Sequence, residues 1–106
     1  MAGIRFEWDE AKNLTNQRKH GVSFQEASQA FWDPLHVIVA DRVVDGEQRW
    51  QALGMVRRAG GSLLVLLVAH TVREDPTHDT VIEVVRIVSA RRATPEERSG
   101  YEDENG

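Results

Sequence analysis

The fold of this chain is decided by the stretch LLVLLVAHT at Leu63–Thr71. It is almost wholly apolar and rich in Leu and Val, a pattern typical of a strand that is covered on both faces. It is far shorter than the roughly 20 residues that cross a bilayer, so we expect no membrane partner. We therefore expect it to form the central strand of a sheet inside a globular domain.

Strand-like segments joined by tight turns lie on both sides of this stretch. Upstream, the segment 48–57 alternates between two faces and follows a strand at 35–44 through Asp45-Gly46, a dipeptide that favours a hairpin turn. A second turn at 59–61 leads into the central strand, and 80–90 forms another strand after a polar loop. Consecutive strands with short connections form an antiparallel meander.

Capping signals place two helices before these strands and one after them. We expect helices at about 10–19, 23–33 and 95–101, the first with Ala11 and Leu14 facing inward. Their caps accept hydrogen bonds from first-turn N–H groups, and they are Asp9, Ser23 and Thr94. The chain is therefore α+β, with a small antiparallel sheet of about four strands and room for a short N-terminal strand at 4–8. We expect the two N-terminal helices to pack on one side of the sheet, and one C-terminal helix to follow the last strand.

Length and composition fit one domain that holds no cofactor. The 106 residues, 41% of them hydrophobic, suit a single domain at 1–101, and we expect the acidic end, 102–106, to be a disordered tail. No Cys occurs, which excludes a disulfide framework, a thiol nucleophile and a thiolate metal site. The start carries no apolar segment of a secretory signal, so we expect a cytoplasmic protein.

The charge balance does not by itself exclude a nucleic-acid partner. The formal net charge is −4, with 13 basic against 17 acidic residues, whereas a simple nucleic-acid-binding surface carries an excess of positive charge. Three of the acidic residues, however, lie in the predicted tail, and nearly all the basic residues are Arg, whose planar guanidinium matches phosphate. Local arrangement therefore decides whether phosphate is bound.

Basic residues gather at the end of the first helix and on the strands. Arg18-Lys19-His20-Gly21 either compensates the helix dipole or forms a site that binds phosphate or handles protons. Arg86 interrupts an apolar strand, so it either pairs with a carboxylate such as Glu83 or holds an anionic substrate. His70 is either a structural residue or a proton-transfer group, and Arg49 lies on a neighbouring strand. The sequence alone does not place these side chains on one face.

A further group lies where the last strand meets the final helix. It consists of Arg91, Arg92, Arg98 and Tyr101. Arg98 and Glu102 either form an i,i+4 pair that solvates the helix, or the four side chains converge on a phosphate.

Other kinds of site have little support. No nucleotide-binding or zinc-protease motif occurs, and the histidines lack ligand spacing. The metal alternative is a loop site built from Glu74, Asp75, His78 and Asp79, although a mobile acidic loop is the simpler interpretation.

Two signatures in the chain resemble those of the BrnT toxins. The N-terminal signature comprises Phe6-Glu7-Trp8-Asp9, Lys12, Asn16, Lys19-His20-Gly21-Val22, Phe24, Glu26-Ala27, Phe31 and Asp33-Pro34. The C-terminal signature comprises Arg86-Ile87-Val88-Ser89-Ala90-Arg91, Ala93, Glu97-Arg98 and Tyr101. The resemblance runs nearly end to end and leaves out only the extreme termini and the loop 73–79.

The resemblance implies a RelE-like fold and the toxin of a type II toxin–antitoxin pair. Such toxins are ribonucleases that arrest translation and are neutralised by a cognate BrnA-like ribbon-helix-helix antitoxin. The RNA substrate is free or associated with the ribosome, and DNA is contacted only through the antitoxin. The arrangement of strands and helices derived above agrees with this fold independently of the resemblance.

Without a metal site, cleavage would use the 2′-hydroxyl of the RNA itself, which needs a base, an acid and cations around the phosphate. We expect Arg86 and Arg91 to hold the phosphate, helped by Arg49, and His70 or His20 to transfer protons. The predicted catalytic residues are His70, Arg86, Arg91 and Tyr101, and the predicted RNA-binding residues are Lys19, His20, Arg49 and Arg92.

Two other classes of function stay open at this point. One is a RelE-like module that has lost catalysis and only docks an antitoxin or a ribosome. Harmless expression without the antitoxin would indicate this class. The other is a metal-dependent nuclease built on the 74–79 loop, which cleavage in the presence of EDTA would exclude.

Overall fold

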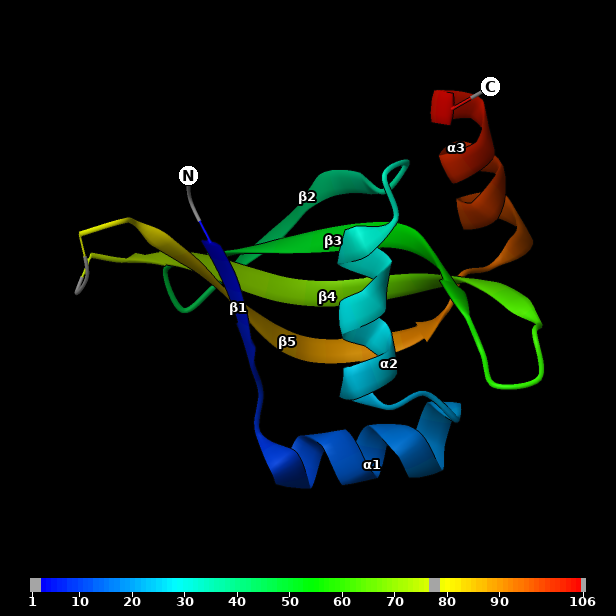
Figure 1. Cartoon of the computed structure of the whole chain (residues 1–106), viewed down its shortest axis with the longest axis horizontal. Coiled ribbons are helices and arrows are strands. Elements are labelled where there is room, and N and C mark those ends of the chain that lie inside the picture. The colour runs from blue at the N-terminus through cyan, green and yellow to red at the C-terminus, as the bar shows by residue number, and fades with distance from the viewer. Residues whose placement is uncertain (1–2, 77–78, 106) are drawn as a thin grey trace.

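A five-stranded sheet with the strand order β1-β5-β4-β3-β2 forms the centre of the computed structural model, which describes residues 3–76 and 79–105 (Figure 1). Helices α1 and α2 and a 3₁₀ helix, η1, precede the meander, and α3 follows it. In chain order the elements are β1 (Gly3–Glu7), α1 (Glu10–His20), α2 (Phe24–Ser28), η1 (Gln29–Trp32), β2 (Val37–Val44), β3 (Glu47–Arg57), β4 (Leu63–Asp75), β5 (Ile82–Arg92) and α3 (Pro95–Asn105).

The meander and its central strand are confirmed. β4, which contains the apolar stretch, lies between β3 and β5, and β2 to β5 pair with their chain neighbours in antiparallel fashion. Asp45 and Gly46 form the hairpin turn with φ values of 52° and 80°. The left-handed geometry of both residues matches the twist of the two strands that they join.

The N-terminal strand makes the sheet larger than the four strands of the meander and is not antiparallel. β1 pairs with β5 in parallel, from Gly3 opposite Ile82 to Glu7 opposite Arg86. The meander β2–β5 leaves the outer edge of β5 unpaired, and β1 pairs with that edge. In the sequence, α1 and α2 connect β1 to the meander. A parallel pair needs such a long connection, which a tight turn does not provide.

The helices differ from the prediction in arrangement and in length. α1 begins at its Asp9 cap and ends at Gly21, whose φ is 69°, but it lies along the outer edge of β5 instead of packing on a face of the sheet beside α2 (Figure 1). The predicted inward position of Leu14 was wrong, because that side chain is 49% exposed. The buried residues of α1 are the polar Asn13 and Asn16, so this helix has no apolar face to bury.

The second predicted helix is split, and the third is longer than predicted. α2 gives way to η1 near β3, where the carbonyl oxygen of Ala30 lies 2.3 Å from the place that a Cβ on Gly54 would occupy. α3 includes the acidic residues that we expected to be disordered and continues to Asn105. The Asn105 amide donates to the carbonyl oxygens of Leu35 and Tyr101 at 2.9 and 2.8 Å, which fixes this end of the helix.

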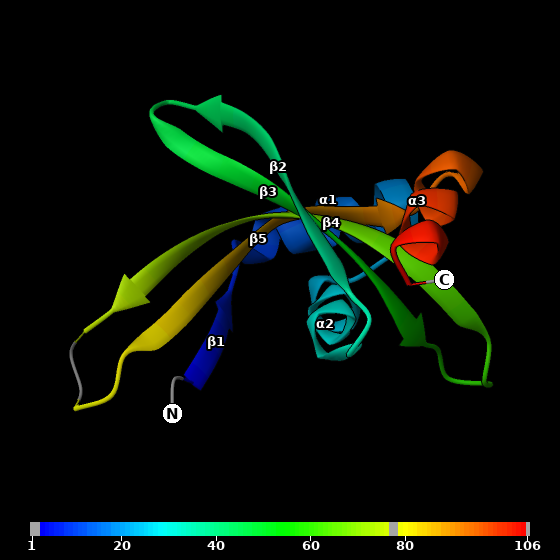
Figure 2. The same ribbon diagram turned by 90° about the horizontal axis from the view of Figure 1, so that it is seen from above.

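Residues on both faces of the apolar stretch in β4 are mostly buried, as the pattern predicts. The main core lies between the sheet and α2, and a smaller core lies on the other face beneath α3 (Figure 2). The smaller core consists of Leu53, Val65, Leu67 and Tyr101. α3 covers only part of its face. The remainder, which we call the open face, carries the side chains that alternate with the main core along β1, β3, β4 and β5.

Candidate functional site

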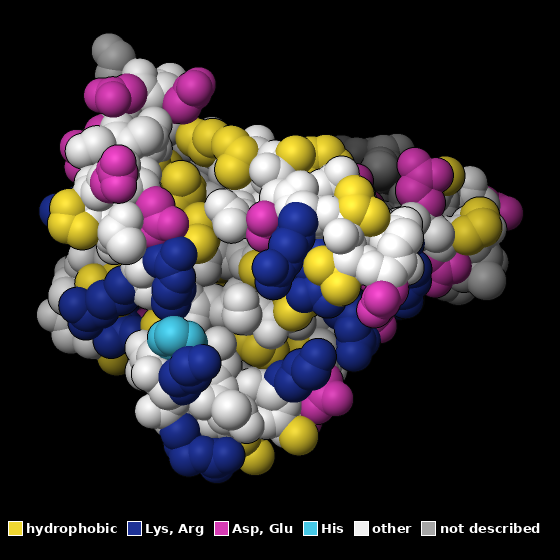
Figure 3. Space-filling model, turned by 180° about the vertical axis from the view of Figure 1, so that it is seen from behind, with side chains coloured by type: hydrophobic (Ala, Val, Ile, Leu, Met, Phe, Trp, Pro, Cys, Tyr) yellow, Lys and Arg dark blue, Asp and Glu magenta, His cyan; other side chains and the backbone are white. Residues whose placement is uncertain are grey.

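Arginines from four strands project from the open face. Along β3, Trp50 pairs with the core residue His70, so the preceding residue, Arg49, points to the open face. By the same alternation Arg5, Arg73 and Arg86 belong to this face. Figure 3 views the molecule from this side and shows Lys and Arg side chains gathered across its middle. A chain with a net charge of −4 therefore presents a locally basic surface.

A β-bulge in β5 brings the predicted phosphate-binding arginines onto the same face. Ala69 pairs with Ser89 but His70 pairs with Ile87, so Val88 is an additional residue in β5. Ile87 and Ala90 consequently both lie in the main core, each 1% exposed. Simple alternation would have placed Arg86 and Arg91 on opposite faces, whereas the bulge places Arg86, Ser89 and Arg91 together on the open face.

The side chain of Asn16 holds β5 next to this bulge. Its Nδ2 donates to the carbonyl oxygens of Ala90 and Val22, both at 2.8 Å, and its Oδ1 accepts from the Ala90 N–H at 3.2 Å. β1 has already ended here, since its pairing stops at Arg86. The amide of Asn16 thus takes the place of a neighbouring strand and ties α1 to the segment that carries Ser89 and Arg91.

A carboxylate lies among the open-face arginines. Glu7, opposite Arg86 in the register, accepts a hydrogen bond from Arg73 and lies 4.0 Å from the Arg86 guanidinium. The hydrogen bond from Arg73 is the main cause that lowers the pKa of Glu7 below its usual range. Arg86 lies across β4 from Arg49, whose buried Nε has no hydrogen-bond partner among the described residues. The open face therefore combines the guanidinium groups of Arg49, Arg73 and Arg86 with the ionised carboxylate of Glu7, which accepts hydrogen bonds.

The arginines of the strand–helix corner do not converge. Arg91 makes two hydrogen bonds to Glu97, at 2.7 and 3.0 Å, which raise the pKa of Arg91 and lower that of Glu97 to about 2. Arg92 pairs with the core residue Leu66 in the register and therefore points away from Arg91. It lines a separate depression with Arg98. Only Arg91 of this group faces the bulge residues.

Two of the predicted catalytic side chains are buried. His70 is fully buried on the α2 side of the sheet, where its ring packs edge-on against Phe31 at 4.8 Å and its Nδ1 lies 3.0 Å from the Val68 carbonyl oxygen. Burial lowers the pKa of His70 and favours the neutral ring. Tyr101 is 5% exposed and donates its hydroxyl to Asp33 at 2.5 Å. Burial is the main cause that raises the pKa of Tyr101 to about 12, and the hydrogen bond to Asp33 is the second cause.

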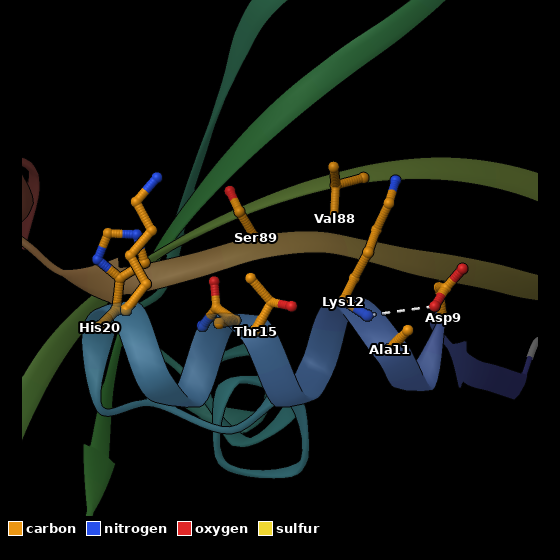
Figure 4. A pocket seen from close by; sticks show the side chains of 9 residues that line it. Asp9, Ala11, Lys12, Thr15, His20, Val88 and Ser89 are labelled. Atoms are coloured by element: carbon orange, nitrogen blue, oxygen red, sulfur yellow. Dashed lines mark hydrogen bonds between the residues drawn. The ribbon is translucent and has the colours of Figure 1, made fainter.

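The two RNA-binding residues predicted at the end of α1 line a groove between α1 and β5. The groove has a volume of about 350 Å³, and its lining residues are Asp9, Ala11, Lys12, Thr15, Asn16, Lys19, His20, Val88 and Ser89. In Figure 4, Lys12 and His20 stand at opposite ends of the groove, and Val88 and Ser89 line its strand side. Ser89 also belongs to the open face, so the groove and that face share this residue.

The metal alternative finds no cluster in the part of the chain that the structure describes. Within residues 3–76 and 79–105, no group of three or more His, Asp or Glu side chains could hold a metal ion. Asp75 lies at the end of β4 and forms an ion pair with Arg5 at 3.4 Å. His78, a member of that predicted loop site, lies outside the described residues.

A comparison with known families matches most of the chain that carries this surface. The family model for the ribonuclease toxin BrnT of type II toxin–antitoxin systems matches residues 8–97. The chain belongs to the BrnT toxin family. It is therefore a ribonuclease toxin of a type II toxin–antitoxin system, with RNA as substrate and an antitoxin as partner. A search of curated proteins found no match.

The BrnT match covers α1, the bulge and the start of α3, and so includes most of the residues at the basic surface. No helix among the described residues combines the length and the apolar character that a membrane crossing requires.

Sequence reasoning missed several residues of this BrnT surface. Lys12, which was not predicted, shares one side of α1 with the predicted residue Lys19, since seven residues make about two helical turns, and this periodicity was readable in advance. Glu7, Arg73 and Ser89 gave no such signal. Their meeting depends on the parallel pairing of β1 and on the bulge in β5, which are long-range features.

Proposed function

We propose that this BrnT toxin is a metal-independent endoribonuclease that cleaves RNA on the open face of its sheet. The 2′-oxygen attacks the adjacent phosphorus while the bond from phosphorus to the 5′-oxygen breaks. The products are a 2′,3′-cyclic phosphate and a 5′-hydroxyl end. The 2′-hydroxyl proton passes to a base, and the leaving oxygen takes a proton from an acid.

The observation that carries this proposal is the bulge that gathers Arg86, Ser89 and Arg91 on one face. Arg86, with Arg49 across β4, stabilises the charge that develops on the phosphate in the transition state. Arg91 adds a third guanidinium, oriented by its two hydrogen bonds to Glu97. Fixed donors stabilise such a transition state well because they need no reorganisation during the reaction.

The proton-transfer role falls to groups that substrate can reach. His20 is partly exposed in the groove that Ser89 also lines, so we assign it a proton-transfer role, with Lys19 as a phosphate-binding neighbour. Glu7 is an ionised acceptor beside Arg86 and is the second candidate base. His70 and Tyr101 are left out of the proposed chemistry because their reactive atoms are buried.

We further propose that this cleavage inhibits translation in the cytoplasm. A cognate antitoxin of the BrnA-like ribbon-helix-helix kind would neutralise the toxin and link the pair to DNA. We also propose that the fold is RelE-like. This structure and the RelE-like fold both combine a small, mainly antiparallel sheet with two N-terminal helices and a C-terminal helix. Association of the substrate RNA with ribosomes would offset the modest attraction that the whole molecule exerts on free RNA.

The test replaces Arg86 or Arg91 by Ala and measures RNA cleavage, growth arrest and antitoxin binding. Each variant should lose at least about 100-fold in cleavage rate, as expected for removal of a transition-state donor, and should still bind the antitoxin. Arg42→Ala, on the exposed edge strand β2, removes the same charge away from the site and serves as control. Full toxicity of both site variants would overturn the assignment.

A chelation experiment tests the metal-independent chemistry separately. Wild-type cleavage should continue unchanged in EDTA and should leave 2′,3′-cyclic phosphate ends. Loss of cleavage in EDTA with recovery on adding a divalent cation would instead support the metal-dependent alternative.

A further inference from the structure

The proposed cleavage chemistry uses only one end of the groove between α1 and β5, at Lys19 and His20, whereas basic side chains line more of its length. Lys12 and Lys19 line it from the same side of α1, about 10 Å apart along the helix axis. Both side chains are exposed, and no ion pair among the described residues holds either ammonium group. The carboxylate in the lining, Asp9, lies at the start of the helix, where it accepts from the Lys12 backbone N–H at 3.2 Å.

The other lining groups suit a sugar–phosphate chain better than a base. Thr15 and Ser89 offer hydroxyls, which serve as donors or acceptors toward ribose and phosphate oxygens. The amide of Asn16, the group best suited to reading a base edge, is already bonded to Ala90 and Val22. Apart from His20, no aromatic ring that could stack on a base lines the groove.

We propose that this groove binds the backbone of the single RNA strand that flanks the cleaved phosphate. Lys12 and Lys19 contact phosphates, and Thr15 and Ser89 contact the sugars between them. The inference rests on the proposed function, because the strand reaches the groove through Ser89, the residue that the groove shares with the open face. Backbone contacts carry no sequence information, so this subsite positions RNA without selecting its sequence.

The groove is small, at about 350 Å³, and lies at the lower end of ligand sites. It accordingly accommodates a short segment of a single strand. The lysine side chains suit this role, because an ammonium group binds phosphate as a compact point charge with rotatable donors.

The experiment measures the binding of an uncleavable 2′-O-methyl RNA oligonucleotide at several salt concentrations. Lys12→Ala and Lys19→Ala should each weaken binding equally for oligonucleotides of different sequence. Each should also reduce the slope of log K against log salt by about 0.7, the value for one phosphate contact on a single strand. Lys12→Arg and Lys19→Arg should retain the wild-type slope.

Arg42→Ala is the matched control, since it removes one positive charge from β2, at the other edge of the sheet from α1. Slopes of the lysine variants equal to that of Arg42→Ala would overturn the inference, because the attraction would then be a diffuse effect of net charge. Weakening that depends on base sequence would overturn it as well. Thermal unfolding of each variant verifies that these exposed substitutions leave the fold intact.

Cleavage and antitoxin binding, measured in parallel, separate the possible failures. If Arg86→Ala abolishes cleavage while the lysine variants match the control in RNA binding, the groove inference fails and the proposed function stands. If the wild type binds the oligonucleotide with the expected slopes yet cleaves no RNA, the proposed function fails. If the lysine variants keep their RNA affinity but lose antitoxin affinity, the groove contacts the antitoxin and the inference is wrong.

Discussion

Replacing Asn16 by Ala should destabilise the protein by about 3 kcal/mol. The side chain is 7% exposed and makes hydrogen bonds of 2.8, 2.8 and 3.2 Å to backbone groups of Val22 and Ala90. A buried polar group left without a partner costs about 1–3 kcal/mol, and three such groups lose a partner here. Because water reaches some of them after truncation, the total stays at the lower end of the summed range of about 3–9 kcal/mol.

Urea denaturation of the purified toxin measures this effect as a lower transition midpoint with an unchanged slope. Asn16→Asp provides a stricter test. It keeps the acceptor for the Ala90 N–H but replaces both donor bonds by a carboxylate facing two carbonyl oxygens, so it should destabilise at least as much as Ala. Gln17→Ala, which removes an exposed side chain with one 3.3 Å bond to Asn13, should change stability by less than about 0.5 kcal/mol.

A stability of Asn16→Ala within about 0.5 kcal/mol of wild type would refute the argument that this amide holds β5. So would a wild-type stability of Asn16→Asp. If the argument is right, RNA cleavage by the Ala variant should also fall under conditions where it is fully folded, because Ser89 and Arg91 lose their fixed position on the open face.

Three further outcomes follow from individual contacts. Gly54→Ala should destabilise the protein by about 3 kcal/mol, since its Cβ would lie 2.3 Å from the Ala30 carbonyl oxygen. Gly100→Ala has free space around its Cβ and should stabilise α3 by about 0.5–1 kcal/mol. Equal effects of the two variants in urea denaturation would contradict this. Tyr101 is the single tyrosine, so ultraviolet titration should give a midpoint near 12 in the folded protein, and a midpoint near 10 would show that its hydroxyl is not buried. The lowered pKa of Glu97 means that its carboxylate contributes stability above pH 4.5 that is lost as the pH falls toward 2. Glu97→Gln should therefore flatten the dependence of stability on pH in this range. An unchanged dependence would contradict the pairing of Glu97 with Arg91 as the cause.

Local signals in the sequence predicted the elements well. Asp9, Ser23 and Thr94 each accept the hydrogen bond expected of a helix cap, from the N–H of Lys12, Glu26 and Glu97 respectively. Caps and turns depend on residues within a few positions of one another, so a short stretch of sequence contains both partners of the interaction. The spacing of Ser23 and Glu26 also predicts a reciprocal bond from the Ser23 N–H to the Glu26 side chain, and this was wrong, since Glu26 pairs with Arg58, directly after β3.

The candidate site was harder to predict because its residues meet through pairing. Arg86 and Arg91 were identified by residue type, but the rule that strand side chains alternate would have separated them onto opposite faces. His70 and Tyr101 have suitable chemistry for proton transfer, yet both are buried. Burial depends on which elements pack against a residue, and a residue's own sequence neighbourhood contains little of that information.

The sequence by itself determined the α+β class, the central position of the Leu63–Thr71 stretch in the sheet and the BrnT family. Each of these follows from local composition, periodicity or motif order. The tertiary structure alone decided that β1 pairs in parallel with β5, that Val88 forms a bulge, and that α1 borders β5 through Asn16. The physical reason is register: a shift of one residue reverses the face of every side chain after it, and only the partner strands fix that shift.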